Sequence, residues 1–554
     1  MSQWVRAPCD ESVISTSATD RSCADRLAPW VLLTAILASA MAFIDGTVVN
    51  VALPAMQRDL HATAGDAQWV VEAYTLMLAS LLLVGGSLGD RYGRKRVVMV
   101  GVAIFGAASV VCGLSQSPGM LIASRLVQGV GAALLVPGSL ALISAAYPDQ
   151  GRRGRAIGTW SGASAITSAI GPVLGGFLVG HFSWRWAFFV NLPFVVVVLL
   201  LLATRVPESL NPKEHGRLDW PGALLASLGL GALVMGVIRA QAGGFDGAAL
   251  AAVFGGVVLL VAFVEWERRL ARDTGERARD PMLPLWLFRS RAFTVTNLLT
   301  LLLYAALSGA LFFVPFDLIE VQGYSPAAAG AALLPFVLIL STLSRWSGGL
   351  VGKYGPRLPL TLGPLVAAAG FALFAIPATG GSYWATFFPA TVVLGLGMAT
   401  TVAPLTTVVM GSVPMENAGA ASGVNNAVSR VAGLLAIALF GIVMVRAFDS
   451  GLEQRMRDAG LSASTQAAMV AQEPQLALAE APPGSDARTR VVIKGAVDDS
   501  FVAAFRVTAL LGALLALASG VVGAVGLPGA AAPARVEKRN RAAGWRAPGS
   551  PTSL

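Results

Sequence analysis

Apolar runs of about twenty residues recur along almost the whole chain, and no other feature constrains the fold as strongly. One of them, VVMVGVAIFGAASVV at 97–111, contains no charged residue. A run of about 20 apolar residues is long enough to cross the hydrocarbon core of a bilayer as a helix. Charged residues make up 13% of the 554 residues, about half the usual share in a soluble domain. The sequence therefore predicts an all-α integral membrane protein and argues against a large soluble one.

The lengths of the apolar runs predict about 14 transmembrane helices. Most connections are short, but two are long, at 266–291 and 446–499. The second contains APPGSDARTR and is polar, so we expect it outside the bilayer, with helix possible in LEQRMRDAG. The expected helices lie at 29–54, 67–88, 97–115, 119–144, 155–180, 185–204, 219–239, 247–265, 292–316, 326–348, 358–378, 384–408, 418–445 and 500–527.

The basic residues predict the orientation. With the N-terminus in the cytoplasm, most of the 40 lysines and arginines fall in segments on the cytoplasmic side. We therefore expect a multi-pass protein of the plasma (inner) membrane with both termini in the cytoplasm. The N-terminal residues lack the pattern of a cleaved signal peptide. Membrane topology accounts for the net charge of +9, so no nucleic-acid partner is required.

A charged joint interrupts two apolar runs at GGSLGDRYGRKR, residues 85–96. Topology alone explains its basic residues, but not the acid Asp90 or the glycines, which let two backbones approach closely. An acid at a helix end can bind a neighbouring basic side chain, so we expect a latch at the cytoplasmic face. The joint recurs weakly as SGGLVGKYGPRL at 347–358, with Gly352 in the place of Asp90. Duplicated halves are typical of secondary transporters.

A few charged or polar side chains fall inside the expected helices. A charge near the bilayer centre is costly, so each is a candidate for a proton or substrate pathway. An acid beside a fixed cation has a tunable pKa, as a proton carrier requires. Structural alternatives remain: Asp45 as a hydrogen-bonded structural acid, Arg125 as an interhelical clamp, Glu72 reaching water near its helix end. The candidates are Asp45, Glu72, Arg125, Asn191 and Arg430.

The stretch SAIGPVLGGFL, at 168–178, combines a proline with small residues in one helix. Proline removes a backbone hydrogen bond, and glycines permit tight helix packing. This predicts either a hinge and seal or a generic packing face. In WRWAFFVNLP, at 184–193, Trp184 and Trp186 are expected in an aromatic belt at the membrane surface.

Together these motifs resemble those of the major facilitator superfamily, and more narrowly its fourteen-helix drug:proton antiporters. The joint at 85–96 is similar to the cytoplasmic loop signature of the superfamily, and LIASRLVQGVGAA at 121–133 to its helix-4 pattern. GPVLGG at 171–176, preceded by Gly162, resembles the helix-5 motif of antiporters. FIDGTVVNVALP at 43–54 and WRWAFFVNLP resemble subgroup patterns. NNAVSRVAGLLAIALFG at 425–441 does so too, with Val431 and Ala432 as departures from it.

The resemblance implies two six-helix bundles related by pseudo-symmetry, plus two extra central helices. The implied divisions are 1–28 (cytoplasmic), 29–204 (first bundle), 205–291 (linker helices and loop), 292–528 (second bundle) and 529–554 (cytoplasmic tail). Asp90 would be the switch acid and Arg94 its partner, facing a helix that begins near Asn417 and Gly419. The implied gating loop comprises Gly86, Asp90, Arg91, Gly93, Arg94 and Lys95. The implied helix-5 motif comprises Gly162, Gly171, Pro172, Gly175 and Gly176.

The expected function is export of drugs or other small amphipathic compounds in exchange for protons. The proton gradient would supply the energy, with no cofactor and no ATP, since no phosphate-binding loop is present. We expect a monomer whose partners are the organic substrate, protons and the bilayer. A dedicated exporter of one metabolite or antibiotic remains an alternative. An integral-membrane enzyme is disfavoured, because the three cysteines and three histidines form no metal-type or catalytic pattern.

Overall fold

The computed structural model describes residues 18–147, 149–209, 219–272, 281–413 and 418–529, and this part of the chain contains helices and no strands. Among these residues, twelve helices are long and apolar enough to cross a membrane. The chain is therefore a multi-pass membrane protein. Helices also form at the two remaining expected positions, but one of them, α15, has only 17 residues, and the expected total of fourteen stays a prediction.

The first seven helices form one bundle, here called the first half. Within it α4 packs against α1, α2 and α3, while α1 also packs against α5 and α7. Its members are α1 (Ala18–Asp59), α2 (Ala64–Tyr92), α3 (Arg94–Gly113), α4 (Pro118–Ala146), α5 (Gln150–His181), α6 (Trp186–Phe189) and α7 (Asn191–Arg205).

The second half begins after an extra pair of helices, α8 (Trp220–Gly243) and α9 (Gly247–Leu270). In it α10, α15, α17 and α19 pack together, and α16 packs against α13 and α15. Its members are η1 (Leu285–Arg289), α10 (Arg291–Phe312), α11 (Val314–Phe316), η2 (Asp317–Val321), α12 (Pro326–Ala332), α13 (Leu334–Ser347), α14 (Leu350–Tyr354), α15 (Arg357–Leu373), α16 (Phe387–Gly411), α17 (Ala418–Asp458), α18 (Ala463–Val470), η4 (Glu473–Leu478) and α19 (Ala487–Gly526).

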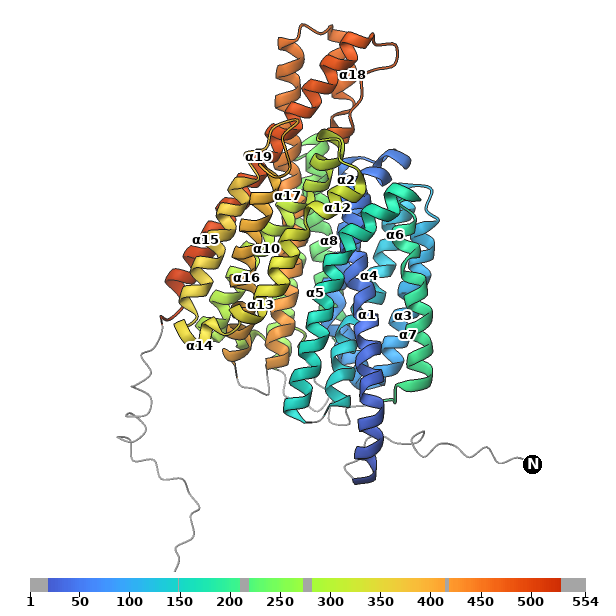
Figure 1. The fold of residues 1–554 in the computed structure, drawn as a ribbon, viewed down its shortest axis with the longest axis vertical. Helices are drawn as coiled ribbons and strands as arrows, with labels where there is room; N and C mark the ends of the chain where they lie inside the picture. The colour runs from blue at the N-terminus through green and yellow to red at the C-terminus, as the bar shows by residue number, and fades with distance from the viewer. Residues whose placement is uncertain (1–17, 148, 210–218, 273–280, 414–417, 530–554) are drawn as a thin grey trace, which may run out of the picture.

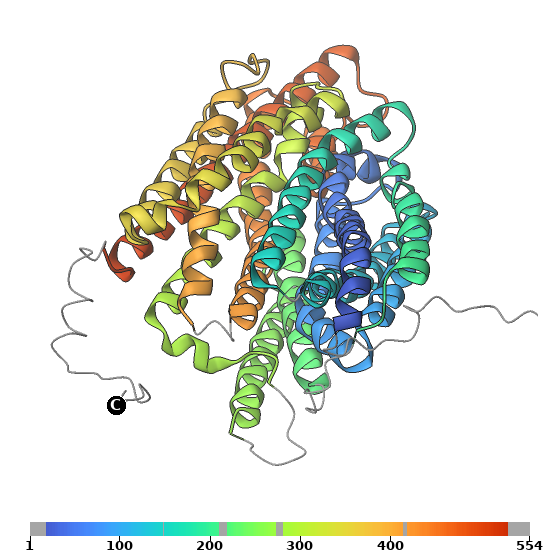
Figure 2. The ribbon, with the colours of Figure 1, turned by 60° about the horizontal axis from the view of Figure 1, so that its bottom comes forward.

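The two halves stand side by side (Figure 1). The end that carries α18 in Figure 1 is called the upper face, and the opposite end the lower face. Helix α8 of the extra pair packs against both halves, through α2 and α17. Figure 2 turns the lower face forward and shows the first half in blue to teal and the second in yellow to red.

Short polar side chains start many of these helices. Thr63 forms a capping box with Asp66 at the start of α2, and Ser117, Asp149 and Ser325 accept backbone N–H groups at the starts of α4, α5 and α12. Such caps satisfy N–H groups that have no partner within the helix. They fix where each apolar run becomes a helix.

The structure differs from the sequence prediction mainly near the upper face. The segment 446–499, expected to be a polar loop, is largely helical. α17 extends into it as far as Asp458 and includes LEQRMRD, as the sequence suggested, and α19 begins already at Ala487. Three expected single helices are divided. The run at 185–204 divides at Val190 into α6 and α7, the run at 292–316 divides at Phe313 into α10 and α11, and the run at 326–348 divides at Leu333 into α12 and α13.

Candidate functional site

A group of buried polar side chains lies inside the first half and is called the polar centre. It draws on α1, α3, α4 and α7, so it joins four helices. None of its members is more than 1% exposed. Its members are Asp45, Ser109, Arg125, Gln128 and Asn191.

Three donors converge on the carboxylate of Asp45. Nη1 of Arg125 lies 2.5 Å from Oδ2. Oδ1 accepts hydrogen bonds from Nε2 of Gln128 at 2.8 Å and Nδ2 of Asn191 at 3.1 Å. Ser109 accepts further bonds from the same two amides, at 2.9 and 3.4 Å. A buried carboxylate needs such donors to offset the loss of water.

Arg125 is held as tightly as the acid. Its Nε donates to the backbone carbonyl of Val70 at 2.9 Å, and its Nη1 also donates to Oε1 of Gln128 at 2.6 Å. The guanidinium lies over the ring of Tyr74, with Cζ 4.3 Å from the ring centroid. The pair with Asp45 is therefore neutral overall, oriented by neighbours and closed to solvent in this conformation.

Glycines of α4 make this arrangement possible. A Cβ on Gly129 would lie 2.5 Å from the carbonyl oxygen of Tyr74, and one on Gly131 would lie 2.7 Å from the backbone nitrogen of Phe105. These positions need glycine because α4 touches the backbones of α2 and α3 there. The helix-4 pattern thus combines the residues that carry the charge with those that bring neighbouring helices close to it.

Glu72 is buried elsewhere on α2, and the expectation that it reaches water is wrong. It is 0% exposed, and no partner contacts either of its carboxyl oxygens among the described residues. One helical turn to either side of it lie Gln68 and Leu76, which face α8 and α17. The sequence could not show that the extra helix α8 covers this face of α2.

Arg430 belongs to the second half, on α17, and no hydrogen bond or ion pair joins it to the polar centre, although it interacts electrostatically with Tyr74, the ring on which Arg125 lies. Arg430 is partly exposed. The structure thus unites three of the five sequence candidates, Asp45, Arg125 and Asn191, and places Glu72 and Arg430 apart. Sequence reasoning missed Ser109 as well as the role of Gln128, since an uncharged polar residue in an apolar helix attracts little notice.

The glycines of α5 pack against two helices. A Cβ on Gly171 would collide with Oγ1 of Thr47, and one on Gly175 would lie 2.7 Å from the carbonyl oxygen of Val48, both on α1. Gly176 meets the carbonyl of Pro326 at the start of α12, across the junction of the two halves.

The same junction brings a second glycine into contact. Gly330 of α12 meets the carbonyl of Pro172 on α5. Gly162 differs from the other motif members, because it is exposed and a Cβ there would meet nothing within 4 Å. The motif therefore forms a close contact between the halves towards the upper face, with Gly162 outside it.

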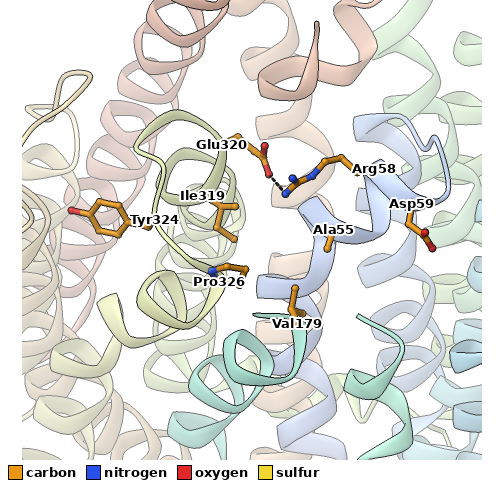
Figure 3. Close-up of a pocket in the computed structure, with 8 residues that line it drawn as sticks. All are labelled: Ala55, Arg58, Asp59, Val179, Ile319, Glu320, Tyr324 and Pro326. Atoms are coloured by element: carbon orange, nitrogen blue, oxygen red, sulfur yellow. Dashed lines mark hydrogen bonds and ion pairs between the residues drawn. The ribbon is translucent and has the colours of Figure 1, made fainter. Parts of the chain in front are cut away.

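An ion pair lies beside this contact, at a pocket of about 630 Å³. Figure 3 shows Arg58 of α1 and Glu320 of η2 pointing towards each other, 2.6 Å apart. The neighbouring Asp59 points away and accepts hydrogen bonds from Trp184 and Arg185. Trp184 is only 3% exposed, so it does not belong to a surface aromatic belt as expected, whereas Trp186 is 48% exposed.

The expected gating loop lies at the lower face and is only partly described. The side chain of Asp90 and residue Asn417 lie outside the described residues, so the latch is not tested. Gly93 has a φ of +105°, which favours glycine. Arg94 donates to the carbonyl of Ala141 at 3.3 Å. Arg91 stacks on Tyr92.

Glu208 occupies the start of α3, which the sequence did not indicate. Its carboxylate accepts the backbone N–H groups of Lys95 at 3.0 Å and Arg96 at 3.3 Å. An acid at this position also interacts favourably with the helix dipole. Among the described residues, no cluster of three or more His, Cys, Asp or Glu side chains is placed to hold a metal ion.

Comparison with known proteins places this geometry in a family. The Major Facilitator Superfamily matches residues 35–437. The puromycin resistance protein pur8 of Streptomyces alboniger is 36% identical over 75% of this chain and 81% of its own length. The tetracenomycin C resistance and export protein of Streptomyces glaucescens is 35% identical over 75% and 76%. The multidrug resistance protein Stp of Mycobacterium tuberculosis is 34% identical over 76% of each.

Solved structures share the fold. A bacterial homologue of the human lysosomal transporter Spinster, solved in an inward-facing and unoccupied conformation, aligns with a TM-score of 0.63 at 19% identity. The alignment covers 92% of this chain and 99% of that one. At this identity the likeness concerns the fold alone.

Proposed function

Because this chain belongs to the Major Facilitator Superfamily, we propose that it exports small amphipathic organic compounds, drugs and antibiotics among them, in exchange for protons. The relatives named for resistance and export support the direction of transport. The lower face would be cytoplasmic, in agreement with the basic residues near 91–96 and 152–155. Helices α2 and α15 would complete a set of fourteen, with α8 and α9 outside the two six-helix bundles.

The pair Asp45–Arg125 is the observation that supports proton coupling. A carboxylate deep in the bilayer region is rare and marks a functional site by default. Protonation of Asp45 would remove the charge that holds Arg125 at 2.5 Å. Since the two residues lie on α1 and α4, a change in their attraction would alter how these helices pack. Asp45 would thus link proton binding to movement of the first half.

The contacts between the halves support alternating access. The Gly176–Pro326 and Gly330–Pro172 contacts and the Arg58–Glu320 ion pair all lie towards the upper face. In the proposed cycle they part when the carrier opens outward, and the gating loop at 85–96 closes the lower face. Rocking of two bundles about a central site is a mechanism typical of secondary transporters.

A dedicated exporter of one compound is the second candidate. Two of the relatives are named for a single antibiotic, puromycin or tetracenomycin C, whereas Stp is named for many drugs. The two candidates share the mechanism and differ in the breadth of compounds that trigger proton release.

The test uses purified protein in liposomes with an acidic lumen and a lumenal pH dye. A panel of lipophilic cations, anions and neutral antibiotics is added, and proton release is followed for wild type, Asp45→Asn and the control Asp246→Asn. Asp246 carries the same charge in the α8–α9 connection, where it pairs with Arg239. We expect release with wild type and the control, and none with Asp45→Asn.

Each other outcome has a distinct meaning. Release that persists in Asp45→Asn would refute Asp45 as the proton site. Release triggered by one compound class alone would favour the dedicated exporter. No release with any compound, together with uptake that ignores the pH gradient, would refute proton exchange.

A further inference from the structure

Four candidates from the sequence carry a charge and lie inside expected membrane-spanning helices: Asp45, Glu72, Arg125 and Arg430. Among the described residues, three of these four are buried. Asp45 and Arg125 neutralise each other at 0 to 1% exposure. Glu72 is 0% exposed and lies in the α2 face covered by α8 and α17. Arg430 alone among these four is partly exposed. Any compound that enters between the halves at this depth would therefore meet a positive charge and no accessible negative one from this set.

The position of Arg430 faces the junction of the halves. It lies twelve residues into α17, about 18 Å from the first residue of that helix. Leu434 and Gly441 share its helix face at helical spacing. Leu434 packs in one cluster with Leu76 of α2, and Gly441 abuts Gln68 of α2 and Gln241 of α8. Arg430 thus lies one turn below the point where α17 touches the first half.

In the part of the chain that the structure describes, neither an ion pair nor a hydrogen bond holds the guanidinium. It lies within electrostatic range of the Tyr74 side chain of α2, which is not a carboxylate and forms no ion pair with it. Arginine keeps its charge in proteins, so it cannot adapt by losing a proton. A partly exposed guanidinium without an ion pair at this depth needs water or an anion to accept hydrogen bonds from its N–H groups.

We propose that Arg430 binds the anionic group of the transported compound, so that the carrier prefers amphipathic organic anions to uncharged compounds of similar shape. This inference rests on the proposed export function and specifies its substrate class. The planar guanidinium offers paired donors that match a carboxylate or sulfonate. A cationic compound would be repelled by Arg430, and the acids that could attract it, Asp45 and Glu72, are closed off in this conformation.

The test compares two fluorescent probes of similar shape, one charged and one neutral: 11-(dansylamino)undecanoic acid, ionised at pH 7.5, and its methyl ester. Binding is measured with the full chain in nanodiscs of phosphatidylcholine. A hydrogen bond to a charged partner predicts that wild type binds the acid about 10- to 100-fold more tightly than the ester. Arg430→Gln should remove this advantage and leave binding of the ester unchanged, and Arg430→Lys should keep part of it.

Arg446→Gln is the matched control. It removes the same charge from the same helix at an exposed position nearer the upper face, and the acid should keep its advantage. If Arg430→Gln does not insert, the wild-type ratio of acid to ester still decides, and a ratio near one overturns the inference. Loss of the advantage only in nanodiscs that contain phosphatidylglycerol would assign Arg430 to a lipid headgroup and also overturn it.

The experiments distinguish a failure of the anion preference from a failure of the proposed export function. Equal binding of the two probes, together with compound-triggered proton release in liposomes, would refute the anion preference and leave the exporter in place. Preferential binding of the acid without proton exchange would support Arg430 as an anion site and refute the coupling.

Discussion

Replacing Asp45 with asparagine should destabilise the protein through Arg125 rather than through Asp45 itself. The carboxylate accepts from Arg125, Gln128 and Asn191. Asparagine keeps one acceptor oxygen but presents an NH₂ group to the remaining donors. The guanidinium of Arg125, 1% exposed, would then be a buried charge without a counter-charge. Breaking a buried pair in this way costs about 3–5 kcal/mol.

The assay is reversible unfolding in mixed micelles titrated with SDS, applied to Asp45→Asn, Arg125→Gln and the double variant. Each single change should lower the free energy of unfolding by about 3–5 kcal/mol. The double change should cost clearly less than the sum, because no unpaired charge remains buried. The matched control is Arg58→Gln with Glu320→Gln, an equally close pair whose arginine is 54% exposed. These changes should cost less than about 1 kcal/mol.

Strict additivity would refute the reasoning, as would single costs below about 1 kcal/mol for the buried pair. Either result would mean that water reaches Arg125 in the unmutated protein. A destabilised Asp45→Asn would also constrain transport experiments, since activity must then be compared at equal amounts of inserted protein.

Three further perturbations test other parts of the structure. Gly176→Leu should stop efflux from cells without stopping membrane insertion, because its side chain would collide with Pro326; Gly180→Leu, where a Cβ meets nothing within 4 Å, should leave efflux intact. Glu208→Ala should lower the free energy of unfolding by about 1 kcal/mol, since α3 loses its cap, and an unchanged SDS midpoint would contradict this. Burial, with the nearby charges of Asp449 and Glu453, raises the pKa of Glu473 from 4.5 to about 7. The folded state therefore favours the protonated acid, and stability of the upper segment should be greatest below pH 4.5 and fall as the pH rises towards 7. The protection factors of the α18 amides, which are corrected for the pH dependence of intrinsic exchange, should be lower at pH 8 than at pH 5, and Glu473→Gln should reduce that difference.

The sequence shows which charged residues lie inside the membrane-spanning helices, but it does not show which residues they contact. Asp45 and Arg125 stand out because each interrupts an apolar run, and their contact across 80 residues follows only from the packing of α1 on α4. Gln128 carries no charge, yet it joins the acid, the arginine and Ser109. Pairwise contacts between distant helices depend on rotation about each helix axis, which periodicity leaves loosely defined.

For the helix-5 motif, too, the sequence predicts close packing but not the partner helix. Its small residues predict close packing, and four of the five members, all but Gly162, do lie in close contacts. The sequence did not show that α12 is the partner helix. Its segment PAAAGAA, which contains Pro326 and Gly330, has no distinctive pattern. Glu208 was equally hidden, since a single acid after a long helix usually faces water.

The long helices α17 and α19 extend the second half rigidly beyond the membrane, so a small rotation of this half moves their ends over a larger distance. Each continues from the membrane-spanning region into the segment that carries α18, so the upper segment is a direct extension of the half to which it belongs (Figure 1). From Arg430 to Asp458 the helix is about 40 Å long. A rotation of the second half by about 10° would therefore swing the tip through about 7 Å. A pair of dyes, one on α18 and one on the upper end of α3, would report each opening of the carrier without touching the groups that bind proton or substrate.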